Sequence, residues 1–271
     1  MSRLRETYKY LFSRGLFYKL NHALFVLSTR GIGILNYENS VLSGENFVLK
    51  KLSRQQWKKF VCIDVGANCG LYSQKVKHII NHSVVYSIEP HPEAFYALKL
   101  GEQHYGYHAF NMAFSDEEKT LELFDRVTET GNTHSHAHAS VYADVIDSLH
   151  KAKLSTVHSV EATTVDAFLE KQSIEHVNFL KIDVEGHEHS VLLGAMQSIK
   201  AEKIDFIQFE FNQMNTVSRV FMRDFFKILS GYKLYRMLQD FLAPLNTNET
   251  LICELFAYQN ILAIRNGVAL K

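Results

Sequence analysis

The stretch Phe60–Ser73, FVCIDVGANCGLYS, decides how this chain folds. Val61, Ile63 and Val65 are apolar and β-branched, which is typical of a strand covered on both faces of a sheet. Asp64 lies near the carboxyl end of this strand. The small residues that follow form a turn into a helix: Gly66, Ala67 and Gly70. Ligands bind at such junctions of open α/β sheets, and the N–H groups of the helix start favour an anion.

The rest of the chain alternates strands with helices after residue 60, which predicts an α/β fold with a doubly wound, mostly parallel sheet. Seven strands are expected: 60–65, 83–88, about 107–112, 176–184, 203–211, 232–237 and 258–265. We also expect a short strand over 46–52, a hairpin strand over 119–124, and helices over about 187–199 and 218–229. Thr163, with Asp166 three residues later, predicts a helix start. Residues 1–44 are interpreted as a helical extension and residues 45–271 as one domain.

Composition excludes several classes of protein. The formal net charge is zero, which argues against nucleic acid as a partner. Three cysteines in no metal-like spacing argue against a disulfide framework. The apolar runs are too short to span a bilayer, and the first residues lack the features of a signal peptide. We therefore expect a cytoplasmic protein.

Acidic or amide side chains stand at the carboxyl ends of four predicted strands: Asp64, Glu89, Asn111 and Asp183. Such ends meet at one edge of a parallel sheet, so these groups are expected to converge on one crevice. Glu89 follows the second strand and is placed to accept hydrogen bonds from two ribose hydroxyls. The turn 66–70 lacks the dinucleotide fingerprint, and no phosphate-binding P-loop is found. Its spacing suits S-adenosylmethionine, whose carboxylate can lie at the helix start.

The chain resembles the FkbM family of S-adenosylmethionine-dependent methyltransferases over roughly residues 45–265. The stretches that carry the resemblance are IDVGANCGLYS (63–73), SIEPHPEAFYAL (87–98), FNMAFSD (110–116), ATTVDAFL (162–169) and FLKIDVEGHEHSVLLGA (179–195), with YQNILAI (258–264) less specific. The resemblance implies a seven-stranded Rossmann-like methyltransferase sheet. It also implies a cofactor site formed by Asp64, Gly66, Asn68, Gly70, Tyr72 and Ser73, with Glu89 on the ribose, Asn111 near the adenine, and Asp183 and Glu185 at the methionine end.

The expected reaction is methyl transfer to an oxygen. A sugar-type hydroxyl keeps its proton at neutral pH, so a positioned base would accelerate the reaction roughly 10²–10⁴-fold. The candidates are Asp183, Glu185 and His187. Histidine has the more suitable pKa and Asp183 the better position.

Two metal hypotheses are weaker. Glu210 and Asn212 end one strand on the same side and, with Asp183, would supply three oxygen ligands for Mg²⁺. Magnesium is therefore considered but not favoured. The run His134, His136 and His138 could bind a transition metal, although a polar loop near the acceptor is the preferred interpretation.

An O-methyltransferase acting on a small hydroxylated molecule or a glycan is the favoured function. The alternative is a non-catalytic nucleoside-binding module. A nucleic-acid methyltransferase is disfavoured because Ile182–Glu185 lacks the Asp/Asn-Pro-Pro-aromatic stretch of enzymes that flip a base. A nicotinamide oxidoreductase is disfavoured because the dinucleotide fingerprint is missing.

The first 30 residues are expected to be helical and carry six basic residues against one acid, Glu6. Three interpretations remain open: a flap packed on the domain, a homodimer contact, or a basic amphipathic surface that touches a membrane. The apolar residues at helical spacing are Leu4, Tyr8, Leu11, Phe12, Leu20, Leu24, Phe25 and Leu27.

Overall fold

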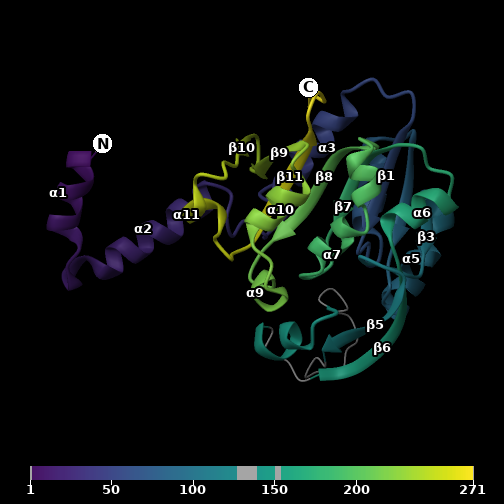
Figure 1. The fold of residues 1–271 in the computed structure, drawn as a ribbon, viewed down its shortest axis with the longest axis horizontal. Coiled ribbons are helices and arrows are strands. Elements are labelled where there is room, and N and C mark those ends of the chain that lie inside the picture. Colours follow the sequence, from purple (N-terminus) through teal and green to yellow (C-terminus); the bar gives the residue numbers. More distant parts are fainter. Residues whose placement is uncertain (1, 127–138, 150–153, 271) are drawn as a thin grey trace.

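The computed structural model describes residues 2–126, 139–149 and 154–270 (Figure 1). In these residues the main sheet has eight strands: β1 (Phe60–Val65), β2 (Ser83–Ile88), β3 (His108–Phe110), β7 (Val177–Ile182), β8 (Ile204–Phe211), β9 (Tyr232–Met237), β10 (Leu242–Pro244) and β11 (Gln259–Arg265). Their order is β10-β9-β11-β8-β7-β1-β2-β3. The five strands from β8 to β3 pair in parallel, and the other three pair antiparallel. The predicted fold class is confirmed, with the short edge strand β10 in addition to the seven strands expected.

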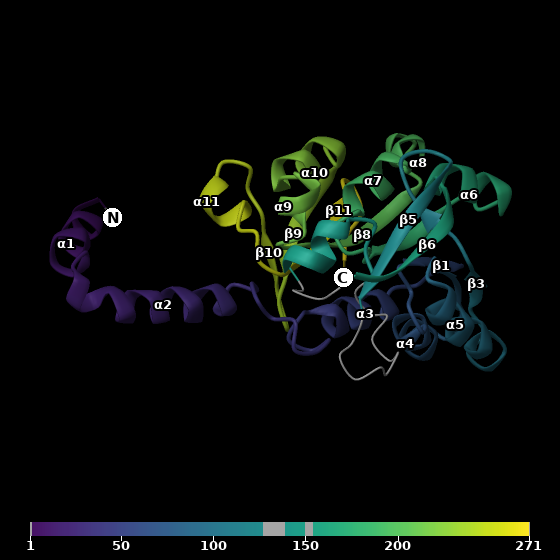
Figure 2. The same cartoon turned by 90° about the horizontal axis from the view of Figure 1, so that it is seen from below.

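Helices cover both faces of the sheet (Figure 2). One face carries α3 (Glu45–Ser53), α4 (Leu71–Ile79) and α5 (Pro92–Tyr105). The other carries α6 (Val165–Lys171), α7 (Glu188–Leu193), α8 (Met196–Lys200) and α10 (Met222–Ile228). A hydrophobic core lies between the sheet and each set of helices, and β1 contributes to both because its side chains alternate between the two faces. Phe60 and Cys62 face the first set of helices, and Val61 and Ile63 face the second.

A smaller sheet lies below the carboxyl edge of the main one (Figure 1). It consists of β4 (Ala113–Phe114), β6 (Leu154–Thr163) and β5 (Lys119–Arg126), in that order. The hairpin strand predicted over 119–124 is therefore confirmed. A π-helical turn at Val145–Leu149, α9 (Asn215–Ser218) and α11 (Thr250–Cys253) complete the domain.

Three local predictions were wrong. Residues 46–52 belong to α3, because Val48, Leu49 and Leu52 all point to one buried face, which a strand cannot do. The helix start near residue 163 is capped by Thr164, whose side chain accepts the N–H of Ala167.

Asp166 does not complete a capping box. Its carboxylate accepts the N–H groups of Gln197 and Ser198 at the start of α8. The helix predicted over 187–199 is divided into α7 and α8. Gly194 separates them where a Cβ would lie 2.0 Å from the carbonyl oxygen of Ser115.

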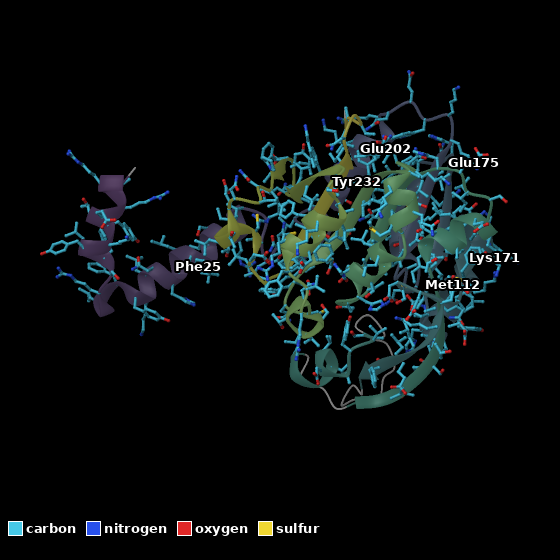
Figure 3. The ribbon with its side chains drawn as sticks, in the orientation of Figure 1. Phe25, Met112, Lys171, Glu175, Glu202 and Tyr232 are labelled. Carbon is cyan, nitrogen blue, oxygen red and sulfur yellow. The ribbon has the colours of Figure 1, made fainter. Side chains whose placement is uncertain are left out.

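Helices α1 (Ser2–Phe12) and α2 (Tyr18–Gly31), joined by a short turn at Gly15–Phe17, extend away from the domain (Figures 1 and 2). Their side chains, Phe25 included, stand clear of it for most of their length (Figure 3). A flap packed on the domain is therefore the wrong interpretation of these helices. None of the helices in the described ranges is long and apolar enough to cross a membrane.

Candidate functional site

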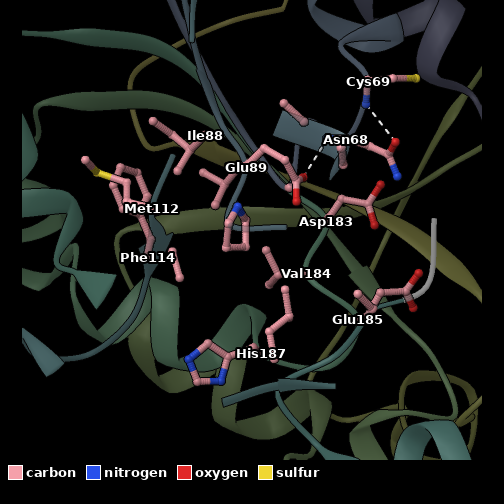
Figure 4. Close-up of a pocket in the computed structure, with 18 of the residues that line it drawn as sticks. Asn68, Cys69, Ile88, Glu89, Met112, Phe114, Asp183, Val184, Glu185 and His187 are labelled. Carbon is pink, nitrogen blue, oxygen red and sulfur yellow. Dashed lines mark hydrogen bonds between the residues drawn. The ribbon is translucent and has the colours of Figure 1, made fainter. Parts of the chain in front are cut away.

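A cavity of about 940 Å³ opens at the carboxyl ends of β1, β2 and β7. This volume lies within the range of small-molecule sites. Its polar end combines the turn after β1 with the segment after β7, and its apolar end includes Met112, Phe114 and Val184 (Figure 4). Sequence reasoning placed a site at this edge of the sheet but did not identify the apolar wall, which partly comes from the smaller sheet.

Glu89 lies at the end of β2 with its carboxylate turned toward the turn after β1 (Figure 4). Oε2 accepts the N–H of Asn68 at 2.7 Å, and Oε1 accepts the N–H of His91 at 2.8 Å. Burial raises the pKa of Glu89 to about 7, although these two N–H groups favour the ionised form. Each carboxylate oxygen has a second lone pair that can accept a ligand hydroxyl.

Lys181 is a buried cation between two carboxylates. Its Nζ lies 3.0 Å from Asp183 Oδ2 and 3.6 Å from Asp64 Oδ1, and it stands over the ring of Tyr72. Burial opposes the charged form, but Asp183 and Asp64 outweigh it and hold the pKa of Lys181 above its usual value. Sequence reasoning missed this residue, although a lysine inside the apolar strand Val177–Ile182 was a signal that it has buried partners.

Asp64 and Ser73 are both fully buried and hydrogen-bonded to each other, Ser73 Oγ donating to Asp64 Oδ2 at 2.7 Å. They lie beneath the turn and do not line the cavity. Gly66 does line the cavity. A glycine is also required at this position by packing, because a Cβ there would lie 1.8 Å from the carbonyl oxygen of Asp183. Gly70 is absent from the cavity wall, and a Cβ there would meet the hydroxyl of Tyr107.

The remaining predicted cofactor residues divide in the same way. Asn68 and Tyr72 line the cavity. Asn111 does not, and its amide instead donates to the carbonyl oxygens of Glu89 and Pro90. It therefore fixes the segment that follows β2. The assignment of all these residues as cofactor ligands stays a prediction.

The three candidate bases, Asp183, Glu185 and His187, all line the cavity (Figure 4). The His187 ring is within hydrogen-bond distance of Ser115 Oγ, at 3.0 Å, and of the Tyr142 hydroxyl, at 3.4 Å. Burial lowers the pKa of His187 to about 4, so the ring is neutral at pH 7 and is a weak base.

Glu188, the first residue of α7, is buried beneath this turn. Its Oε1 accepts the N–H groups of Val184 and Gly186, at 3.2 and 3.1 Å. Glu185, between them, has a positive φ of 54°, which costs free energy in a residue other than glycine. Burial raises the pKa of Glu188 to about 7. Glu188 thus stabilises the strained turn that carries Glu185 and leads from Asp183 to His187.

Asn212, one of the three residues considered for magnesium, is held by contacts just after β8. Asn212 Oδ1 accepts the N–H of Met214, and its Nδ2 donates to Glu210 Oε2 at 3.3 Å. Burial and the charges of Asp183 and Glu185 raise the pKa of Glu210. His134, His136 and His138 lie outside the described residues.

A family model, the methyltransferase FkbM domain, matches residues 64–234. No curated protein matches the sequence. The fold is similar to that of the precorrin-6y C5,15-methyltransferase of Geobacter metallireducens, with 11% identity, 82% of this chain and 87% of that chain covered, and a TM-score of 0.40.

Two other solved structures show a likeness of the same order. The plantazolicin methyltransferase BpumL, solved with SAH, has 12% identity, coverage of 95% of this chain and 93% of that chain, and a TM-score of 0.43. A SAM-dependent methyltransferase from Aquifex aeolicus has 10% identity, coverage of 83% and 91%, and a TM-score of 0.42. Likenesses this distant carry no information on substrate. The family match covers more than half of the chain, and the chain therefore belongs to the FkbM family of S-adenosylmethionine-dependent methyltransferases.

Proposed function

We propose that the chain transfers the methyl group of S-adenosylmethionine to a hydroxyl oxygen of a neutral, hydroxylated acceptor, with sugars and glycans as the acceptor class. The observation that carries the proposal is the charge of the cavity wall. Four of the described residues that line it carry a carboxylate: Glu89, Glu93, Asp183 and Glu185. Among the same residues, Lys181 is the one lysine or arginine. Because Lys181 is already paired with Asp183, the wall disfavours acceptors that carry phosphate or carboxylate.

The residues around Glu89 suit the donor. The second lone pairs of its carboxylate can accept the two ribose hydroxyls while the first remain on Asn68 and His91. The turn after β1 can receive the methionine end near the start of α4. When bound, S-adenosylmethionine supplies a methyl group made electrophilic by its sulfonium.

In the proposed step the acceptor oxygen attacks this methyl carbon. The oxygen–carbon bond forms as the carbon–sulfur bond breaks, and the electron pair of the broken bond stays on sulfur. The acceptor proton passes to a carboxylate of the chain. Burial lowers the pKa of His187 to about 4, which removes the advantage that an imidazole ordinarily has over a carboxylate as a base, so Asp183 and Glu185 are retained as the candidates for this role. Holding donor and acceptor in line supplies most of the acceleration.

The test is a transfer assay with S-adenosylmethionine labelled on its methyl group. Separated fractions of cellular glycans, lipid-linked sugars, nucleic acid and protein serve as acceptors, and the product is identified by mass spectrometry. We expect a methyl ether on a sugar hydroxyl and no label with the Glu89→Ala variant. Label confined to nucleic acid or to protein nitrogen would contradict the proposal.

Two further outcomes separate the alternatives. Tight cofactor binding with no label in any fraction would favour the non-catalytic nucleoside-binding module. Turnover that stops in excess EDTA and returns with Mg²⁺ would revive the magnesium hypothesis, whereas we expect turnover to continue.

A further inference from the structure

The arm, defined as residues 2–28 with helices α1 and α2 up to the last turn, has an organised interior of its own. Tyr8 donates its hydroxyl to Asn21 Oδ1 at 2.6 Å, and the Asn21 amide donates to the carbonyl oxygen of Phe12. The rings of Tyr8 and Phe12 stack, and Phe17 meets Phe12 edge to face. These contacts fix the bend between the two helices.

The arm joins the domain only near its carboxyl end. Thr29 and Ile34 are buried, the N–H of Leu35 donates to the carbonyl oxygen of Tyr258, and Arg236 donates to the carbonyl oxygen of Ile32. Residues before Thr29 stand away from the domain, as Figures 1 and 3 show. These contacts attach residues 29–35 to the domain. The helices that precede them cover no part of the described domain surface.

Each helix of the arm carries an apolar stripe on its surface. On α1 it consists of Leu4, Tyr8 and Leu11, and on α2 of Leu20, Leu24 and Leu27. All six side chains are exposed, Leu4 by 75% and Leu27 by 66%. Helices of this length draw most of their stability from packing such a face. No described part of the domain covers the stripes, so they remain available to a surface outside the described residues.

The charge of the arm selects the kind of surface. Residues 2–28 contain one acidic residue, Glu6, and five basic residues: Arg3, Arg5, Lys9, Arg14 and Lys19. Beyond Gly31 the chain carries 23 basic and 28 acidic residues. Basic side chains beside an exposed leucine stripe are the features of a helix that lies in the interface of an anionic bilayer.

We propose that the arm binds the surface of an anionic lipid bilayer, with its apolar stripes in the headgroup region and its basic residues on the lipid phosphates. A second copy of the chain fits less well. The large apolar side chains that are exposed on the described part of the domain are scattered over separate elements, as Leu100 on α5 and Leu251 on α11 illustrate. This proposal is independent of the acceptor and of methyl transfer.

The experiment is sedimentation of the full chain with lipid vesicles. One set of vesicles contains phosphatidylcholine alone and the other phosphatidylcholine mixed with phosphatidylglycerol. We expect binding to the mixed vesicles that weakens at high salt, and at least tenfold weaker binding to phosphatidylcholine alone. Protein that stays in the supernatant with the mixed vesicles would overturn the proposal.

Two arm variants test the two halves of the argument: Leu20→Glu with Leu24→Glu and Leu27→Glu, and Arg3→Gln with Arg5→Gln and Lys19→Gln. Each is expected to weaken binding at least tenfold. The matched controls, Leu100→Glu and Leu251→Glu, replace leucines that are 66% and 84% exposed on the domain and should leave binding unchanged. Equal losses in the controls would overturn the assignment to the arm.

Light scattering during size exclusion separates the remaining alternative. We expect a monomer in every variant. A dimer that the triple leucine variant dissociates, with no vesicle binding, would show that the arm pairs with a second copy. Unchanged circular dichroism and cofactor binding verify that the variants are folded.

Discussion

Protonation of Glu89 should control the affinity for S-adenosylmethionine. A carboxylate can accept both ribose hydroxyls, whereas the protonated acid cannot do so with both oxygens. Because burial raises the pKa of Glu89 to about 7, about nine tenths of the free protein is protonated there at pH 6 and about one tenth at pH 8. The ligand binds the ionised form, so affinity rises with pH and levels off above the pKa. The expected gain from pH 6 to pH 8 is about tenfold.

Isothermal titration calorimetry in buffers of different ionisation enthalpy measures both the affinity and the protons released. At pH 6 the binding of one ligand should release nearly one proton, and at pH 8 almost none. In Glu89→Gln we expect the affinity to fall by about 2–4 kcal/mol, because charge-assisted hydrogen bonds are lost. The pH dependence should disappear with them.

One control and one complication belong to this experiment. Burial raises the pKa of Glu188 to a similar value, so Glu188→Gln must keep the pH dependence if Glu89 is its source. The amide that Glu89→Gln introduces can accept only one of the N–H groups of Asn68 and His91, so thermal unfolding is measured in parallel. A flat affinity between pH 6 and pH 8, or a slope that survives Glu89→Gln, would refute the reasoning.

Three further predictions concern the segment after β7 and its support. Asp183→Asn should lower kcat by about 10²–10⁴-fold with less than about a tenfold loss of cofactor affinity, and equal losses in initial-rate and binding measurements would make it a cofactor ligand only. Lys181→Met leaves the fully buried Asp64 without its cation. The free energy of unfolding, measured in urea, should therefore fall by about 3–5 kcal/mol. A fall of less than about 1 kcal/mol would contradict the ion-pair argument. Glu188→Ala removes the acceptor for the Gly186 N–H and should lower kcat more than it raises KM. Glu188→Gln should keep most of the rate, because its amide oxygen can still accept this N–H. An alanine variant with normal kcat would exclude this positioning role.

The main sheet could be predicted because its strands are buried on both faces. β1 and β2 have the predicted bounds, since runs of β-branched residues end there at a glycine or a proline. Residues 46–52 were misread because a short apolar run is compatible with a strand and with a buried helix. The smaller sheet was incompletely predicted, because its strands pair across a long connection that has no regular pattern.

The candidate site shows a similar limit. The sequence correctly indicated that Glu89 and Asp183 stand at strand ends that meet at one edge, and both line the cavity. It could not tell that the Asp64 side chain would be buried beneath the turn. Alternation along β1 assigns the Asp64 side chain to the same face as Phe60 and Cys62. Whether that side chain lines the cavity or lies buried depends on its partners, here Ser73 and Lys181.

The half of the site that would hold the donor and the half that carries the candidate bases are joined by direct backbone and side-chain contacts. The N–H of Asp183 donates to the carbonyl oxygen of Val65, and the missing side chain of Gly66 lets the Asp183 carbonyl approach. Lys181 connects Asp64 with Asp183 under the same turn. In-line transfer tolerates little misplacement of donor and acceptor. The glycine at position 66 therefore serves the close packing of the turn after β1 against the segment after β7, and a side chain there would separate the two halves.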